Sequence, residues 1–130
     1  MKIKISELID DALDWAVVTA NGGSPTVETN AIGENIIRDG CVITCPSTIW
    51  SQGGPIIERE KVTLSPRFHA ERSESGVDVY RQEGWLAYVA PSSFWVSPRA
   101  VGGPTPLIAA MRCYCASKLG DEVDVPDELC

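Results

Sequence analysis

Apolar residues recur at the spacing of a helix in the first part of the chain. Leu8, Ala12 and Trp15 are separated by three or four positions, so they would lie on one face of a helix. Ser6 precedes them and belongs to a residue type that caps helix N-termini, while a pair of glycines follows the pattern. The pattern predicts a helix over about residues 6–20.

A second helix is predicted near the other end, where its boundaries are marked by capping residues. Thr105 is a suitable N-cap, Pro106 is favoured at the first helical position, and Gly120 is favoured just past the last. Apolar side chains cover most of the circumference of this helix, over residues 105–119. We therefore expect it to be buried on more than one side.

Short apolar runs between the helices are typical of strands. Asp39-Gly40 is a turn sequence between two of them. The segment 66–83 is polar and predicts an exposed loop or a long hairpin, and 92–100 reads as irregular. The predicted strands lie at residues 2–5, 36–38, 41–44, 61–64 and 84–90.

These elements predict an α+β fold in a single small domain. A mostly antiparallel sheet would be packed by two main helices, at about 6–20 and 105–119. The chain has 130 residues, which is the size of one domain, and no stretch has the composition of a linker. The domain is therefore expected to span residues 1–130.

The charge balance narrows the classes of partner. Eleven basic against eighteen acidic residues give a net charge of −7, so we expect no direct binding to nucleic acid or to an anionic membrane. No apolar run is long enough to span a membrane, and the N-terminal segment lacks the apolar core of a signal peptide. These features predict a cytoplasmic protein.

The cysteines and the single histidine argue against metal binding and catalysis. Five cysteines without a secretion signal indicate reduced thiols, and their spacing is not that of a zinc site. His69 stands in a polar stretch, and no nucleophile, phosphate-loop or dinucleotide motif is present. We expect a non-catalytic protein with no metal and no cofactor.

Three blocks of sequence resemble one protein family. They are the C-terminal stretch that begins at Gly103-Pro104-Thr105-Pro106, the block Leu13–Val17, and the block Ser51–Glu60. Together they resemble the NinX-type family of small proteins from tailed bacteriophages and prophages. The segments near 22–48 and 66–83 look like variable or inserted loops. The resemblance implies a phage accessory protein in the host bacterial cytoplasm, and it implies no mechanism.

Two Gly-Gly-Pro triplets, at 53–55 and 102–104, suggest a binding site. Each lies near an aromatic residue and an arginine, and the second precedes a helix N-terminus, where an anion is favoured. The first triplet predicts an irregular backbone in which Pro55 opens a single helical turn. The predicted ligand-binding residues are Trp50, Gln52, Gly53, Gly54, Pro55, Arg59, Trp85, Gly103, Pro104, Thr105 and Arg112.

Each of these residues also has an ordinary structural interpretation. The triplets can be tight turns, the tryptophans can belong to the core, and Arg112 can pair with Asp14 or Glu58. If the two triplets meet at one pocket, an indole would stack on a base while backbone N–H groups and arginines hold phosphate. Such a pocket would suit a small anionic ligand such as a cyclic nucleotide or an ADP-ribose derivative.

The leading hypothesis is a homo-oligomeric phage protein that binds and sequesters such a ligand without turnover. A nucleotide-derived immune signal of the host would be the sharpest example of the ligand. The alternative is a protein–protein effector or inhibitor of a host nucleic-acid or defence enzyme. An acidic C-terminal segment, with five acids over residues 121–128, is compatible with that alternative.

Overall fold

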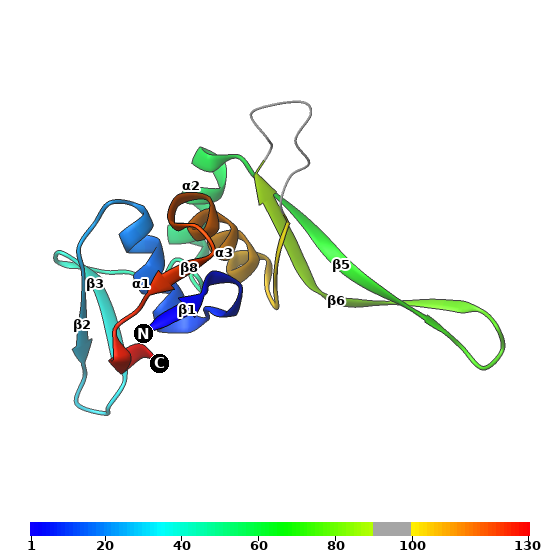
Figure 1. The fold of residues 1–130 in the computed structure, drawn as a ribbon, viewed down its shortest axis with the longest axis horizontal. Coiled ribbons are helices and arrows are strands. Elements are labelled where there is room, and N and C mark those ends of the chain that lie inside the picture. Colours follow the sequence, from blue (N-terminus) through cyan, green and yellow to red (C-terminus); the bar gives the residue numbers. More distant parts are fainter. Residues whose placement is uncertain (90–99) are drawn as a thin grey trace.

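The computed structural model describes residues 1–89 and 100–130 and has an α+β fold, as predicted. Within these residues a central helix is surrounded by two further helices and by three small antiparallel sheets (Figure 1). The helices are α1 (Asp10–Ala20), α2 (Trp50–Glu60) and α3 (Pro106–Leu119). Two 3-10 turns, η1 (Ile5–Glu7) and η2 (Asp127–Leu129), complete the helical elements.

The strands form three antiparallel sheets instead of the single predicted one. β1 (Lys2–Lys4) pairs with β8 (Glu122–Asp124), so the first and last strands of the chain lie side by side. A second sheet contains β2 (Pro25–Thr29), β3 (Asn35–Asp39) and β4 (Val42–Ile43). The third contains β5 (Val62–Arg72), β6 (Asp78–Val89) and β7 (Val101–Gly103), with β6 in the middle.

The helix α3 forms the centre of the core, and its predicted boundaries are confirmed. Thr105 caps it by accepting a hydrogen bond from Ile108 N at 3.1 Å, and Pro106 is its first residue. Nine consecutive residues, Leu107–Cys115, are buried. A helix buried all round needs cover on several sides, as expected, and it is covered by α1, α2 and the sheet of β5, β6 and β7.

The helix predicted over 6–20 is interrupted at its start. Ser6 lies in η1, and α1 begins only at Asp10, with no side-chain cap. In a continuous helix the Leu8 carbonyl would accept from an N–H four residues later, but it accepts instead from Arg112 Nε at 2.7 Å. Asp10 then turns the chain with φ +49°, a value that Asp tolerates better than most residues. Tertiary contacts therefore override the local helical pattern.

The irregular turn predicted at Gly53-Gly54-Pro55 is wrong, because these residues lie inside α2, a third main helix. Pro55 stands in its second turn, and Ile56 is buried. A Cβ on Gly53 would lie 2.5 Å from Leu107 Cδ1 and would also collide with the Pro46 carbonyl oxygen. The glycine therefore permits close packing of α2 against the start of α3.

The two segments interpreted as variable or inserted loops contain strands. In 22–48 the turn at Asp39-Gly40 is confirmed, with Gly40 at φ +63°, but β2 was not predicted. The segment 66–83 is the outer part of the β5–β6 hairpin, which confirms the hairpin interpretation. The predicted end of a strand at residue 90 and most of the irregular stretch 92–100 lie outside the described residues.

The described helices leave no candidate for a membrane span, because none combines the necessary length with enough apolar character. The longest, α3, has 14 residues, whereas a bilayer requires about 20.

Asp14 is an ionisable group inside the core. It is 3% exposed, and its Oδ1 accepts a hydrogen bond from Ser47 N at 2.8 Å. Burial raises the pKa of this carboxyl from 3.8 to about 6, and the hydrogen bonds from Ser47 oppose the rise. Because the folded state binds this proton more tightly than the unfolded state, Asp14 makes the protein less stable as the pH rises from about 4 to 6.

We predict that Asp14→Asn removes this pH dependence, since asparagine keeps an acceptor for Ser47 N and does not titrate. From about pH 4 to pH 7 the free energy of unfolding of the wild type should fall by about 2 kcal/mol relative to that of the variant. Urea unfolding at several pH values measures this difference. Asp78→Asn, at the exposed end of the hairpin, is the control, and parallel pH profiles for wild type and Asp14→Asn would contradict the prediction.

Candidate functional site

A cleft of about 560 Å³ lies where β6, β7 and α3 meet. Four of the predicted ligand-binding residues line it, namely Trp85, Gly103, Pro104 and Arg112. The remaining lining residues are Ser6, Arg67, Glu83, Gly84 and Gly102. The second Gly-Gly-Pro triplet therefore forms one wall of this cleft. A neighbouring hollow of about 760 Å³ shares Ser6 and Gly102 with this cleft, but two acids and one lysine line it.

A β-bulge shapes the cleft. Two residues of β6, Glu83 and Gly84, stand opposite the single residue Arg67 of β5. Gly84 has φ +88°, which is favourable for glycine and strained for other residues. A Cβ on Gly102 would lie 3.7 Å from Arg67 Nη1, so the Arg67 guanidinium extends over β7. The bulge thus brings a cationic side chain from the hairpin to the cleft.

Arg112 brings a second guanidinium from α3, and it is buried. Its side chain is 8% exposed, Nε donates to the Leu8 carbonyl at 2.7 Å, and Nη1 donates to the Gly102 carbonyl at 3.0 Å. Burial lowers the pKa of its guanidinium. Arginine nevertheless keeps its charge in proteins at neutral pH. Within the described residues no carboxylate forms an ion pair with it. Neither Asp14 nor Glu58 is its partner.

The two arginines make the cleft a cationic site beside Gly102. The backbone carbonyls at Arg112 supply partial charges only, so its positive charge is not neutralised by a carboxylate among the described residues. Arg67 likewise forms no ion pair within the part of the chain that the structure describes. Glu83 is the one carboxylate that lines the cleft. A buried charge without a counter-ion is costly, and an anion in the cleft would offset that cost.

The helix N-terminus contributes less to anion binding than the sequence suggested. Pro106 has no N–H, Ile108 N bonds the Thr105 side chain, and Ala109 N bonds the Thr105 carbonyl. These donors are therefore absent or already used. Thr105 caps the helix and does not line the cleft.

Gly103 of the triplet and Gly84 of the bulge allow β6, β7 and α3 to approach one another closely. A Cβ on Gly103 would lie 2.6 Å from Ala109 N, and a Cβ on Gly84 would lie 2.6 Å from Gly103 O. The bulge of β6 therefore packs on β7, and β7 packs directly on α3. Gly84 and Gly103 have this structural role whether or not a ligand binds.

The other predicted site residues lie on α2, and none of them lines the cleft. Trp50 is half exposed, Gln52 accepts from Cys45 N, and Gly53 is buried. Gly54 and Pro55 belong to the same helix. The structure therefore does not bring the two Gly-Gly-Pro triplets together at one pocket.

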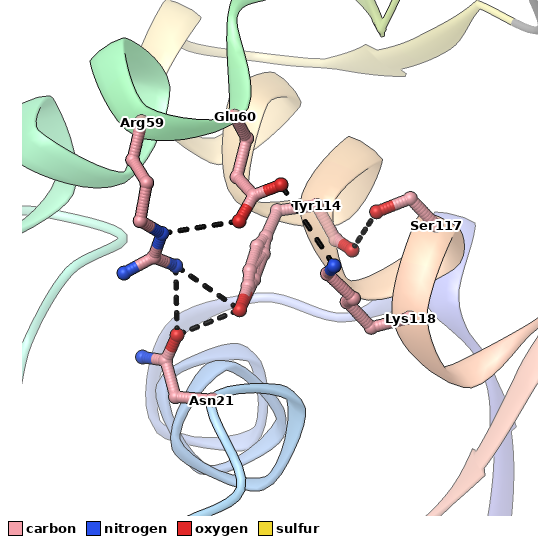
Figure 2. A network of polar contacts seen from close by, with 6 residues as sticks. All are labelled: Asn21, Arg59, Glu60, Tyr114, Ser117 and Lys118. Carbon is pink, nitrogen blue, oxygen red and sulfur yellow. Dashed lines mark hydrogen bonds and ion pairs between the residues drawn. The ribbon is translucent and has the colours of Figure 1, made fainter. Parts of the chain in front are cut away.

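Arg59, at the end of α2, takes part in a polar network between the three helices (Figure 2). Its Nη2 donates to Asn21 Oδ1 at 3.0 Å and to the Tyr114 hydroxyl at 3.2 Å, and its Nε donates to Glu60 at 3.0 Å. The Tyr114 hydroxyl donates to Asn21 Oδ1 at 2.6 Å. Arg59 therefore holds α2 against the ends of α1 and α3.

The remaining chemistry-bearing residues do not form a reactive cluster. His69 lies on the exposed hairpin opposite Arg81, and no group suited to a metal ion is found among the described residues. Burial raises the pKa of the Cys115 thiol to about 12, and it also raises the pKa of Cys45 and Cys113. Thiols of this kind are poor nucleophiles at neutral pH.

Arg67 was not among the predicted ligand-binding residues, because it lies in the segment 66–83, which was interpreted as a variable loop. One local feature of the sequence does indicate the bulge next to it. Gly84 is an isolated glycine within a strand pattern, and such a glycine often marks a bulge. The pairing of that bulge with Arg67 depends on hairpin register, which the polar turn does not determine.

The chain matches a known family over most of its length. A family model described as "Bacteriophage P22, NinX" matches residues 4–118. This range includes the residues that line the cleft, the helices α1 and α2, and all of α3 except its last residue. No curated protein matches the chain.

The packing role of the triplets predicts unequal effects for two glycine substitutions. Gly103→Ala should destabilise the protein by about 1–3 kcal/mol, because its Cβ meets the backbone of α3. Gly54→Ala should change stability by less than about 1 kcal/mol, because apart from its chain neighbours nothing lies within 4 Å of the added Cβ, and the gain in helix propensity is opposed by the ring of Pro55. Urea unfolding compares the two, and a neutral Gly103→Ala would show that β7 does not pack closely on α3.

Proposed function

Because the chain belongs to the NinX family of bacteriophage proteins, we propose that it is a phage accessory protein that binds a small anionic ligand. The ligand occupies the cleft at Gly102 and is held without turnover. The observation that carries this proposal is the buried Arg112, whose charge faces the cleft and has no carboxylate partner among the described residues. An anion is the ligand that this charge recognises.

The position of Arg67 supports a ligand with a phosphate or carboxylate group. Its guanidinium is exposed and free to move onto an anion that Arg112 already attracts. Two guanidiniums near one backbone glycine offer several N–H donors in a small volume. Arg112 is fixed by two backbone carbonyls, so little conformational freedom is lost when it binds.

Trp85 and Glu83 support a ligand that also has a flat ring and hydrogen-bond donors. Trp85 is partly buried against the core and also lines the cleft, so its indole offers a surface for stacking. Glu83 can accept hydrogen bonds from hydroxyl or amino groups. A nucleotide has all three features, and the cleft volume of about 560 Å³ is within the range of small-molecule sites.

The residues around the cleft favour binding over chemistry. The lining contains no histidine, cysteine or aspartate, and Ser6 and Glu83 are its sole hydroxyl and carboxylate side chains within the described residues. Sequestration requires affinity and abundance and no catalytic group. In this proposal the ligand is a nucleotide-derived signal of host immunity, and the protein acts in the host bacterial cytoplasm.

We predict that a cyclic dinucleotide or trinucleotide, or an isomer of ADP-ribose, raises the melting temperature of the purified protein. Binding to the native state alone increases stability with ligand concentration. The ligand is then released by heat, and its mass is compared before and after. An intact ligand agrees with sequestration, whereas a cleaved one would make the protein an enzyme. No shift with any of these compounds favours the alternative, an effector that binds a host protein.

Arg67→Ala tests the site itself. The affinity for the anionic ligand should fall about 10- to 100-fold, as for the loss of a charge-assisted hydrogen bond, while the melting temperature of the free protein stays nearly constant. Arg81→Ala, farther out on the same hairpin, is the matched control and should bind normally. Arg112→Ala is less informative, because it also removes the bonds to Leu8 and Gly102 and should destabilise the fold. Unchanged affinity in Arg67→Ala would place the ligand elsewhere.

A further inference from the structure

The outer part of the β5–β6 hairpin, residues 68–82, extends away from the rest of the molecule as a two-stranded arm (Figure 1). Its turn is well ordered by hydrogen bonds, with Ser73 N bonded to Val77 O at 2.9 Å and Gly76 N bonded to Ser73 O at 2.9 Å. Among the described elements no helix and no third strand packs on the arm (Figure 1). An isolated two-stranded ribbon is at best marginally stable in water, so a surface that covers the arm would stabilise it.

One face of the arm carries apolar side chains of the kind that are normally packed against other elements. Near the body, Val62, Leu64 and Ala87 of this face pack into the core. Because side chains alternate along a strand, the same face continues on the arm with Phe68, Ala70 and Tyr80. The polar residues of this face are Gln82, opposite Phe68, and the pair Arg72 and Asp78 next to the turn. Phe68 is 59% exposed and Tyr80 is 69% exposed. We call this surface the arm face.

The opposite face of the arm is mainly polar. It carries His69, Glu71 and Arg81 together with the half-exposed Val79, and Arg81 lies 4.0 Å from Glu71 in an ion pair. Antiparallel sheets commonly have one apolar face packed and one polar face solvated. Residues 68–82 hold two basic and three acidic residues, so the arm is not a nucleic-acid ribbon. Its chemistry instead fits an apolar protein surface.

The body of the molecule has a second uncovered apolar surface, which we call the body patch. It contains Ile43 of β4 together with Ile49 and Trp50 at the start of α2. The Gln52 side chain holds these two segments together, because it accepts from Cys45 N at 2.6 Å and donates to the Ile43 carbonyl at 3.4 Å. All three apolar side chains are exposed, Trp50 by 53%. Val42 is also exposed, but as the neighbour of Ile43 in β4 it points to the other face of the strand.

The arm face and the body patch cannot cover each other within one chain. The arm extends away from the side of the molecule where β2 and β3 lie, and β4 pairs with β3 (Figure 1). We propose that they pair between two copies of this chain, so that each arm lies on the body patch of the other copy. A two-fold axis makes this contact reciprocal and closed.

The area favours the reciprocal arrangement. The arm face exposes on the order of 300 Å² of apolar surface and the body patch also on the order of 300 Å², from side chains that are about half exposed. A reciprocal dimer therefore buries roughly 1,200 Å² in total, which is at the lower end of the range of stable interfaces. A single arm on a single patch buries roughly half of that, which is the size of a weak contact.

The wild-type chain should sediment at equilibrium as a dimer of twice 14.1 kDa at a concentration of about 100 µM. Phe68→Ser/Tyr80→Ser, the arm variant, and Ile43→Ser/Trp50→Ser, the patch variant, should each weaken the dimer at least about 30-fold. Ile32→Ser is the control, because Ile32 is 78% exposed and lies on neither surface. All five side chains are exposed, so the melting temperatures at low concentration should stay close to that of the wild type.

A mixture of the two variants gives a sharper test. The patch variant keeps its arm and the arm variant keeps its patch, so one of the two contacts can form, and mixed dimers should outnumber dimers of either variant alone. A wild-type chain that stays monomeric overturns the proposal. So does a patch variant that dimerises like the wild type while the arm variant does not, because the arms would then pair with each other.

Discussion

The burial of α3 on all sides is the constraint on which the rest of the structure depends. Nine consecutive buried residues leave no face of the helix for water, so α1, α2 and the β5–β6–β7 sheet must each pack against it. Two of these contacts are so close that only glycine fits, at Gly53 against Leu107 and at Gly103 against Ala109. The two Gly-Gly-Pro triplets are thus the places where neighbouring segments meet the central helix.

Arg112 links that constraint to the candidate site. A helix buried all round has no solvent face for an arginine, so its guanidinium extends along the helix surface to the carbonyls of Leu8 and Gly102. The first bond uses the carbonyl that would have continued a helix through residue 8, and the second fixes β7 beside the cleft. The Arg112 side chain therefore ends the helical pattern at residue 8, positions β7 and supplies positive charge to the cleft.

Features encoded by neighbouring residues could be predicted from the sequence, and features set by distant contacts could not. The cap at Thr105 and the turn at Gly40 are local, and both were found. The helix α2 was missed because glycine and proline disfavour a helix locally, while packing on Leu107 stabilises it. At the site, Trp85 and Arg112 line the cleft as expected, whereas Arg67 reaches it only through a register shift across the hairpin.

The pairing of β1 with β8 has a consequence for synthesis on the ribosome. Lys2 is opposite Asp124, and Ile5 N bonds the carbonyl of Asp121 at 2.9 Å. β1 therefore leaves the exit tunnel long before its partner β8, and Leu8 leaves it 104 residues before Arg112. Closing so long a loop is slow compared with forming a helix or a hairpin. The β1–β8 pair thus forms only after translation has passed residue 124, whereas the contacts of α1 with β2 and β3 can form earlier.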